Sequence, residues 1–309
     1  MRPVLGVLLK IASGLVLTGM VMLVKIVGAR IPIGEVVFAR TFFSLFPILA
    51  MIAIRGELGS ALRLHRPKLH VARAAVGLVA MASWFGALTM MPLPDATAIS
   101  YSAPLYSVAF AALFLGETVR AYRWGAVFVG FVGMLVIMSP HLGLGSVTET
   151  AEARTGALLC LVAAVGMAGA MTLVRKMTET EKTASIVLFF ALVGSVLSLA
   201  TLPFGWVWPS PYDAFLLVMT GLVGGFGQFL LTQSYRYADA STIAPFDYIQ
   251  LIWAMMVGWA VFGEVPTLAF YIGGAIVAAS GLFVIYREHR LGLDRDRTRQ
   301  RRAGTPAKY

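Results

Sequence analysis

Apolar residues fall in blocks of about 20 along almost the whole chain. A block of that length spans a ~30 Å hydrocarbon core as an α-helix. Short stretches rich in Gly, Pro or charge separate the blocks, as at residues 31–34, 91–94 and 208–211. The pattern predicts ten transmembrane helices, at residues 4–27, 33–54, 71–91, 95–115, 121–139, 155–176, 183–203, 213–235, 240–262 and 266–286.

The composition agrees with a chain that is covered by lipid. Of the 309 residues, 59% are hydrophobic and only 13% are charged. A soluble domain of this length needs about a quarter charged residues to cover its surface. No polar run is long enough to fold as a separate domain. The first block is predicted to be an uncleaved helix, because Lys10 interrupts it and no small-residue cleavage pattern follows. We therefore expect an all-α integral membrane protein.

The net charge of +10 indicates orientation rather than nucleic-acid binding. Most Lys and Arg residues lie at one side of the predicted helices and near the C-terminus, while Lys25, Arg30 and Arg154 lie at the other side. Cytoplasmic connections of membrane proteins carry the excess of Lys and Arg. The charge pattern predicts a multi-pass protein of the cell inner membrane with both termini in the cytoplasm. Residues 287–309 alternate Arg with Asp and are expected to form a disordered basic tail.

The two halves of the sequence resemble each other. Residues 94–97 (Pro-Asp-Ala-Thr) match residues 238–241 (Ala-Asp-Ala-Ser), and residues 133–137 match residues 281–285. Between these matches, both halves end a predicted helix with Gly-Glu. The sequence thus predicts two repeats, 1–139 and 155–286, joined by a periplasmic linker at 140–154. Five helices are an odd number, so the second repeat must insert upside down, as in many secondary transporters with a midplane site between the halves.

Ionisable groups at bilayer depth are costly and call for a reason. Asp247 lies about two turns into its predicted helix. It is expected either to bind a cationic group or a proton, or to form a structural ion pair with Arg40. Arg40 is a candidate for an anionic substrate group, for that pairing, or for snorkelling to the interface. Glu35 begins a predicted helix, where a carboxylate is favoured by the helix dipole.

Polar and aromatic side chains inside other predicted helices extend the candidate site. Gln228, Thr232 and Tyr235 share one helical face, and aromatic rings either stack on a planar ligand or pack against neighbours. The candidate substrate-binding residues are Arg40, Trp84, Tyr101, Tyr106, Gln228, Thr232, Asp247, Tyr248 and Trp253. Small residues at four-residue spacing, as in Gly221 with Gly225 and Gly274 with Ala278, are expected to pack helices closely.

The sequence argues against an enzyme. All four histidines fall in predicted loops or the tail, no His-Glu-x-x-His motif is present, and Asp247 has no clear second aspartate for intramembrane proteolysis. We expect no catalytic residue, cofactor or metal site. The single Cys160 lies in an apolar block and cannot form an intramolecular disulfide. A passive channel or facilitator remains the alternative to a carrier, although no filter motif is visible and the inverted repeat favours a carrier.

Several motifs resemble the EamA family of the drug/metabolite transporter superfamily. They are residues 95–98 (Asp-Ala-Thr-Ala), residues 103–105 (Ala-Pro-Leu) and the paired Gly-Glu helix ends. Residues 34–43 and 239–248 are most similar to a subgroup that includes S-adenosylmethionine uptake transporters, and riboflavin transporters look similar too. In those relatives an Arg occupies the position of Arg40.

The resemblance implies alternating access, coupled to protons or run as exchange. It also implies a cavity lined by the first, third, fourth, sixth, eighth and ninth predicted helices. The substrate is expected to be a small molecule such as S-adenosylmethionine, riboflavin or an amino-acid-like metabolite. The expected state is a monomer or homodimer in the lipid bilayer.

Overall fold

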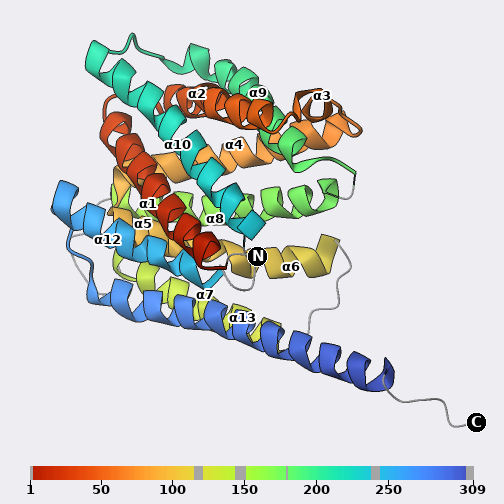
Figure 1. Cartoon of the computed structure of the whole chain (residues 1–309). Coiled ribbons are helices and arrows are strands. Elements are labelled where there is room, and N and C mark those ends of the chain that lie inside the picture. The colour runs from red at the N-terminus through yellow and green to blue at the C-terminus, as the bar shows by residue number, and fades with distance from the viewer. Residues whose placement is uncertain (1–2, 115–120, 143–150, 179, 238–243, 304–309) are drawn as a thin grey trace, which may run out of the picture.

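The structure is a computed structural model that describes residues 3–114, 121–142, 151–178, 180–237 and 244–303 (Figure 1). In these ranges it contains helices and no strands. The elements are α1 (Pro3–Gly28), α2 (Ile33–Ile54), α3 (Leu58–Ala61), α4 (Pro67–Met90), α5 (Leu93–Ser100), α6 (Ala103–Phe114), α7 (Ala121–Met138), η1 (Pro140–Leu142), α8 (Ala151–Met177), α9 (Thr183–Ser198), η2 (Leu199–Phe204), α10 (Pro211–Tyr237), η3 (Ala244–Tyr248), α12 (Ile249–Phe262) and α13 (Leu268–Ala303).

Among the described residues, eight candidate membrane spans are long and apolar enough to cross a bilayer, and two further apolar helices, Trp124–Met138 and Phe246–Phe262, are shorter. The predicted spans 4–27, 33–54 and 121–139 agree within one residue with α1, α2 and α7. The all-α membrane architecture predicted from the apolar blocks is confirmed for the described residues.

The predicted span 95–115 is broken into α5 and α6, with Tyr101 and Ser102 between them. Pro104 explains the break, because it has no N–H to donate and its ring clashes with the carbonyl four residues earlier, at Ser100. The backbone tightens instead: the Ser102 N–H donates to the Ile99 carbonyl at 3.0 Å. The span therefore turns within its length, and residue 101 is placed at the turn.

The predicted span 240–262 is also irregular. Its residues 240–243 lie outside the described residues, and the described part begins with the 3₁₀ turn η3 before α12 starts at Ile249. The predicted tail differs as well, because α13 continues as a helix through Ala303 (Figure 1). Residues 304–309 of that tail lie outside the described residues.

The two halves pack reciprocally. The first helix of the first half, α1, packs along α10, the long helix before η3 and α12, while α8, which opens the second half, packs along α4. The last long helices of the halves, α7 and α13, pack on each other (Figure 1). In this packing α1 corresponds to α8, and α4 corresponds to α10, so exchanging the two halves reproduces the same contacts. Contacts of this kind relate the halves by an approximate two-fold axis.

Small residues allow helices to pack closely, and Gly221 and Gly225, which the sequence predicts to do so, bring α10 close to α2. A Cβ added to Gly221 of α10 would collide with Phe43 of α2, and one added to Gly225 would collide with Pro47. Gly274 is an exception, because an added Cβ would meet nothing within 4 Å. Its neighbour Gly273 packs against α7 instead, so the predicted packing face of α13 was wrong by one residue.

Candidate functional site

Lys10 and Asp247 form an ion pair between α1 and η3. The Lys10 Nζ lies 2.5 Å from Asp247 Oδ1, and the Lys10 side chain is only 6% exposed whereas that of Asp247 is 41% exposed. The ammonium also lies over the ring of Tyr235, 5.4 Å from its centroid. The pair thus joins three elements and leaves the carboxylate accessible from one side.

The irregular parts of two predicted spans meet beside this pair. The Tyr101 hydroxyl, at the break between α5 and α6, donates to the Asp247 carbonyl at 2.6 Å and lies 3.1 Å from Gln250 Oε1. The rings of Tyr101 and Tyr248 lie 5.4 Å apart at 31°. The sequence-predicted residues Tyr101, Asp247 and Tyr248 are therefore brought together.

Asp247 pairs with Lys10 and not with Arg40, which corrects the ion pair suggested by the sequence. Arg40 lies in the interface between α2 and α10, close to Gly224, and its buried Nε has no hydrogen-bond partner within the described part of the chain. The sequence did contain a signal for Lys10, because a lysine within an apolar span needs a counter-charge or a functional reason. Lys10 therefore does more than interrupt the apolar run of the first predicted helix, because it supplies the counter-charge of Asp247.

The other predicted site residues are spread more widely. Trp253 of α12 faces Gly14 of α1, and its buried indole N–H is without a hydrogen-bond partner among the described residues. Trp84 packs partly buried against the main core cluster. The Thr232 hydroxyl donates to the Gln228 carbonyl of its own helix. Tyr106 turns toward α7, with its hydroxyl 3.7 Å from Met134 Sδ.

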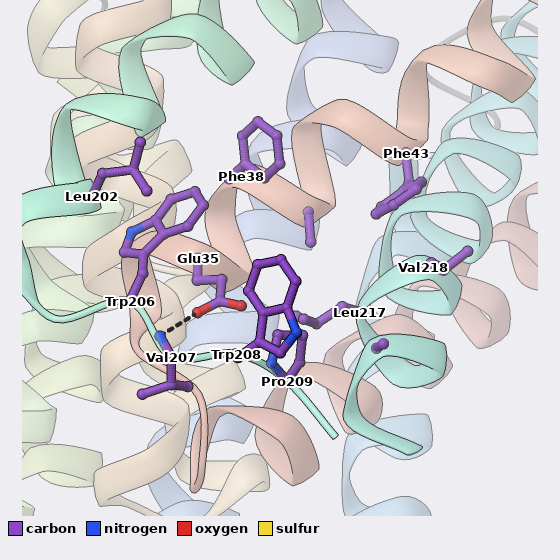
Figure 2. Close-up of a pocket in the computed structure, with 12 residues that line it drawn as sticks. Glu35, Phe38, Phe43, Leu202, Trp206, Val207, Trp208, Pro209, Leu217 and Val218 are labelled. Carbon is purple, nitrogen blue, oxygen red and sulfur yellow. Dashed lines mark hydrogen bonds between the residues drawn. The ribbon is translucent and has the colours of Figure 1, made fainter. Parts of the chain in front are cut away.

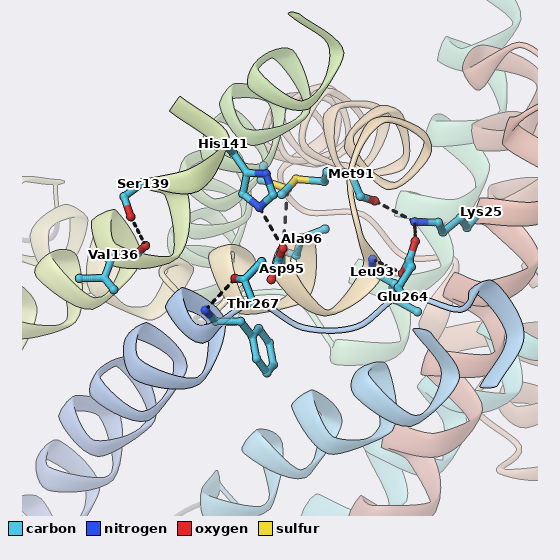
Figure 3. A network of polar contacts seen from close by, with 12 residues as sticks. Lys25, Met91, Leu93, Asp95, Ala96, Val136, Ser139, His141, Glu264 and Thr267 are labelled. Carbon is cyan, nitrogen blue, oxygen red and sulfur yellow. Dashed lines mark hydrogen bonds and ion pairs between the residues drawn. The ribbon is translucent and has the colours of Figure 1, made fainter. Parts of the chain in front are cut away.

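A second lysine of α1 makes a different ion pair. Lys25 Nζ lies 2.5 Å from Glu264 Oε1 and donates to the Met91 carbonyl at 2.8 Å (Figure 3). Glu264 Oε2 accepts the backbone N–H of Leu93 at 2.8 Å. Gly263 ends α12 in the left-handed conformation (φ +65°), as a helix C-cap often does, and so allows Glu264 to reach back. This pair ties α1, α5 and α12 together.

Asp95 and His141 form a buried polar contact near the Lys25 side of α5. The Asp95 Oδ2 lies 2.9 Å from His141 Nε2, and the two residues are 1% and 7% exposed (Figure 3). Cys160 is buried nearby, with its Sγ 3.5 Å from Met91 Sδ. These residues link α5 to η1 and α8, so they stabilise the helix ends rather than line the Lys10–Asp247 site.

Glu181, between α8 and α9, accepts hydrogen bonds from the connection before α4. The backbone N–H groups of His65 and Arg66 donate to its carboxylate at 2.8 and 2.7 Å. Burial tends to raise the pKa of Glu181, but these hydrogen bonds, the His65 side chain and the nearby His70 outweigh it and hold the pKa below its usual value. Glu181 therefore joins the connection between α8 and α9 to the connection before α4.

Within the described ranges, no group of three or more His, Cys, Asp or Glu residues could hold a metal ion. A cavity of about 430 Å³ lies apart from the Lys10–Asp247 pair, between α2, α10 and the connection before α10. Glu35 lines this cavity (Figure 2).

Several characterised proteins are similar to this chain. The S-adenosylmethionine uptake transporter of Rickettsia prowazekii is 30% identical over 266 residues, which cover 86% of this chain and 87% of that protein. The riboflavin transporter of Rhizobium johnstonii is 28% identical, covering 75% and 74% of the two chains. The pseudopaline exporter CntI of Pseudomonas aeruginosa is 28% identical and covers 89% and 94%.

A solved crystal structure of a protein at 22% identity has the same fold, with a TM-score of 0.63 over 93% of this chain and 99% of that one. The relatives named above are transporters rather than enzymes, and the chain is a multi-pass membrane protein. The EamA-like transporter family matches residues 4–139 and again residues 154–287. With both halves matched, the chain belongs to the EamA-like transporter family.

Proposed function

We propose that the chain is a secondary active transporter that moves a small organic metabolite across the inner membrane by alternating access. In this proposal ten helices cross the bilayer in two inverted repeats of five, with both termini in the cytoplasm. The reciprocal packing of α1 on α10 and of α8 on α4 supports it. Two related halves can exchange conformations, which gives outward-open and inward-open states of similar energy.

The Lys10–Asp247 pair is the observation that carries the proposal. It lies where the irregular parts of two spans meet, and broken helices near the midplane form the binding sites of many secondary transporters. The half-exposed Asp247 carboxylate can accept a cationic group, and the released Lys10 ammonium can bind a carboxylate. A substrate with both groups replaces the ion pair without leaving either charge unpaired.

This chemistry favours a zwitterionic substrate. S-adenosylmethionine and free amino acids each carry an ammonium and a carboxylate, whereas riboflavin carries neither. Tyr101 and Tyr248 supply aromatic faces beside the pair, on which a planar or cationic group stacks. We therefore rank S-adenosylmethionine and amino-acid-like metabolites above riboflavin.

Uptake into proteoliposomes tests the proposal. Labelled S-adenosylmethionine, riboflavin and amino acids are offered with and without a pH gradient. We expect accumulation of a zwitterion above its external concentration when the gradient is present, or exchange when the vesicles are preloaded with unlabelled substrate. Accumulation of riboflavin alone would overturn the ranking of zwitterions above riboflavin. Absence of transport for every solute would overturn the proposal that the chain transports these metabolites.

A passive facilitator is the alternative function, and the same assay distinguishes the two. A facilitator equilibrates the solute and never concentrates it, and its rate is insensitive to preloading. Protons are the candidate coupling ion, with Asp247 as the candidate carrier. If Asp247→Asn still concentrates substrate on a pH gradient, Asp247 is not the proton-carrying group.

A further inference from the structure

The cavity beside Glu35 is separate from the Lys10–Asp247 site. It is lined by Glu35, Phe38, Phe43, Trp206, Trp208 and Leu217 among others, from α2, α10 and the connection before α10 (Figure 2). It lies at the Lys25 end of α1, because Glu35 follows the short turn after that helix. Lys10, by contrast, lies within the first half of α1, about two turns from its start.

Glu35 is a buried carboxylate in the first turn of α2, where the helix dipole favours a negative charge but no cation pairs with it among the described residues. The residue is 6% exposed, and its Oε2 accepts one hydrogen bond, from the Val207 N–H at 3.2 Å. No Lys, Arg or His in the described ranges forms an ion pair with it. The two basic residues nearest to it in the sequence, Arg30 and Arg40, are placed elsewhere: Arg30 is held by Asp213, and Arg40 lies against Gly224. A buried carboxylate in apolar surroundings is costly unless a cation or a proton balances it.

The walls of the cavity suit a cation. The rings of Phe38 and Trp206 lie 5.4 Å apart, and the indole of Trp208 lies on the other side of the Glu35 carboxylate (Figure 2). Ammonium groups bind over aromatic faces, most strongly over Trp. The remaining lining is apolar, so the cavity offers a negative group and aromatic faces but no other charge.

The cavity is open toward the outside of the helix bundle. Trp208 lines it while 99% exposed, so that side is uncovered. The neighbouring surface is apolar, because Phe42 and Phe46 of α2 and Phe204 of η2 are exposed. In a membrane protein an exposed aromatic surface of this kind meets lipid, and Trp residues gather at the level of the headgroups. An occupant can therefore extend from the cavity along an apolar surface.

From these observations we propose that the cavity binds a phospholipid with an ammonium headgroup. The ammonium group lies between the Trp206 and Trp208 faces against the Glu35 carboxylate, and the chains follow the surface of Phe42 and Phe46. The lipid stabilises the α2–α10 interface from outside and takes no part in the transport step.

Native mass spectrometry of the purified protein in detergent tests this assignment. The detergent carries equal amounts of phosphatidylethanolamine and phosphatidylglycerol with identical chains. We expect the wild type to retain the ethanolamine lipid about two- to fivefold over the glycerol lipid, which is the ratio of an exposed cation–π contact. Glu35→Gln should abolish the preference, whereas Glu152→Gln, which removes an exposed carboxylate at the start of α8, should preserve it.

Two further variants keep the test decisive. Trp208→Ala removes an aromatic face without disturbing a buried group, and it should lower the preference even if Glu35→Gln folds poorly. Lys10→Met should leave the preference intact, so failure of the transport proposal and failure of the lipid proposal are distinguishable. A preference that survives both Glu35→Gln and Trp208→Ala would overturn the site. Free phosphoethanolamine should not displace the lipid; displacement at equal concentration would assign the cavity to a soluble ammonium compound instead.

Discussion

Both lysines of α1 pair with carboxylates that flank α12, yet the two pairs differ in what surrounds them. From Lys10 to Lys25 the helix rises about 22 Å, so the Lys25 pair lies at the end of the span and the Lys10 pair lies within it. Asp247 precedes α12 and Glu264 follows it. The Lys25 and Glu264 side chains are 12% and 16% exposed, while the Asp247 side chain is 41% exposed.

The partners differ as well. Glu264 also accepts the Leu93 N–H, and Lys25 also donates to the Met91 carbonyl, so both charges of that pair have further hydrogen bonds. A buried ion pair is favourable only when such bonds complete it. The Lys25–Glu264 pair therefore holds three helix ends together. The Lys10–Asp247 pair keeps one accessible carboxylate, which is the condition for exchanging its partner with a substrate.

The largest expected effect is on uptake. Asp247→Asn and Lys10→Met should each lower the initial rate at low substrate concentration by at least about 30-fold, because truncating one member of a hydrogen-bonded charge pair costs about 2 kcal/mol or more. The proteoliposome assay measures this, with the exposed Glu152→Gln as the matched control. Uptake within twofold of the wild type in both variants would place the substrate elsewhere.

The second effect is on stability. Glu264→Gln leaves the buried Lys25 without a counter-charge, and we expect it to lower the free energy of unfolding by about 3 kcal/mol. The double variant Lys25→Met with Glu264→Gln should recover part of that loss, since it removes the stranded charge. Thermal unfolding in detergent measures both. If the double variant is less stable than Glu264→Gln alone, the two residues do not act as a pair.

A smaller effect is expected at Tyr101, which belongs to the Lys10–Asp247 side of the comparison. Tyr101→Phe keeps the ring beside Tyr248 but removes the hydroxyl that donates to the Asp247 carbonyl. One such hydrogen bond is worth about 1 kcal/mol, so the apparent KM should rise about fivefold while the maximal rate changes less. Concentration-dependent uptake separates the two quantities. A loss of maximal rate with unchanged KM would assign Tyr101 to the conformational change instead of binding.

The sequence predicts those parts of this molecule that depend on length and local chemistry. The ends of α1, α2 and α7 follow from apolar blocks that must match the bilayer. The role of the Gly263-Glu264 pair at a helix end follows from its recurrence in both halves. The break at Tyr101 was not predicted, because a proline in a membrane helix is often tolerated. Pro104 nevertheless gives the physical reason for the break.

The pairing of Asp247 was the main error, and it shows what a single sequence lacks. Arg40 and Lys10 are both cations within apolar spans, and either could neutralise an acid on a later helix. Only the rotation of each helix decides between them, and that rotation depends on packing: α2 meets α10 through Phe43 and Gly221, which directs Arg40 toward Gly224. The predicted roles of Trp84, Gln228 and Thr232 in binding stay predictions.

The smallest expected effect is the pH dependence of stability, and Glu181 is the carboxylate outside both pairs that should cause it. Its pKa is held below 4.5 in the folded protein, so its contribution is present above the unfolded pKa and is lost as the pH falls through the folded value. Glu181→Gln should therefore lower the melting temperature near neutral pH and flatten its decline below pH 4.5. The decline is measured by thermal unfolding in detergent at a series of acidic pH values. If the variant declines as steeply as the wild type, Glu181 is not the acid-sensitive group, and another paired carboxylate, such as Asp213 beside Arg30, must account for the decline.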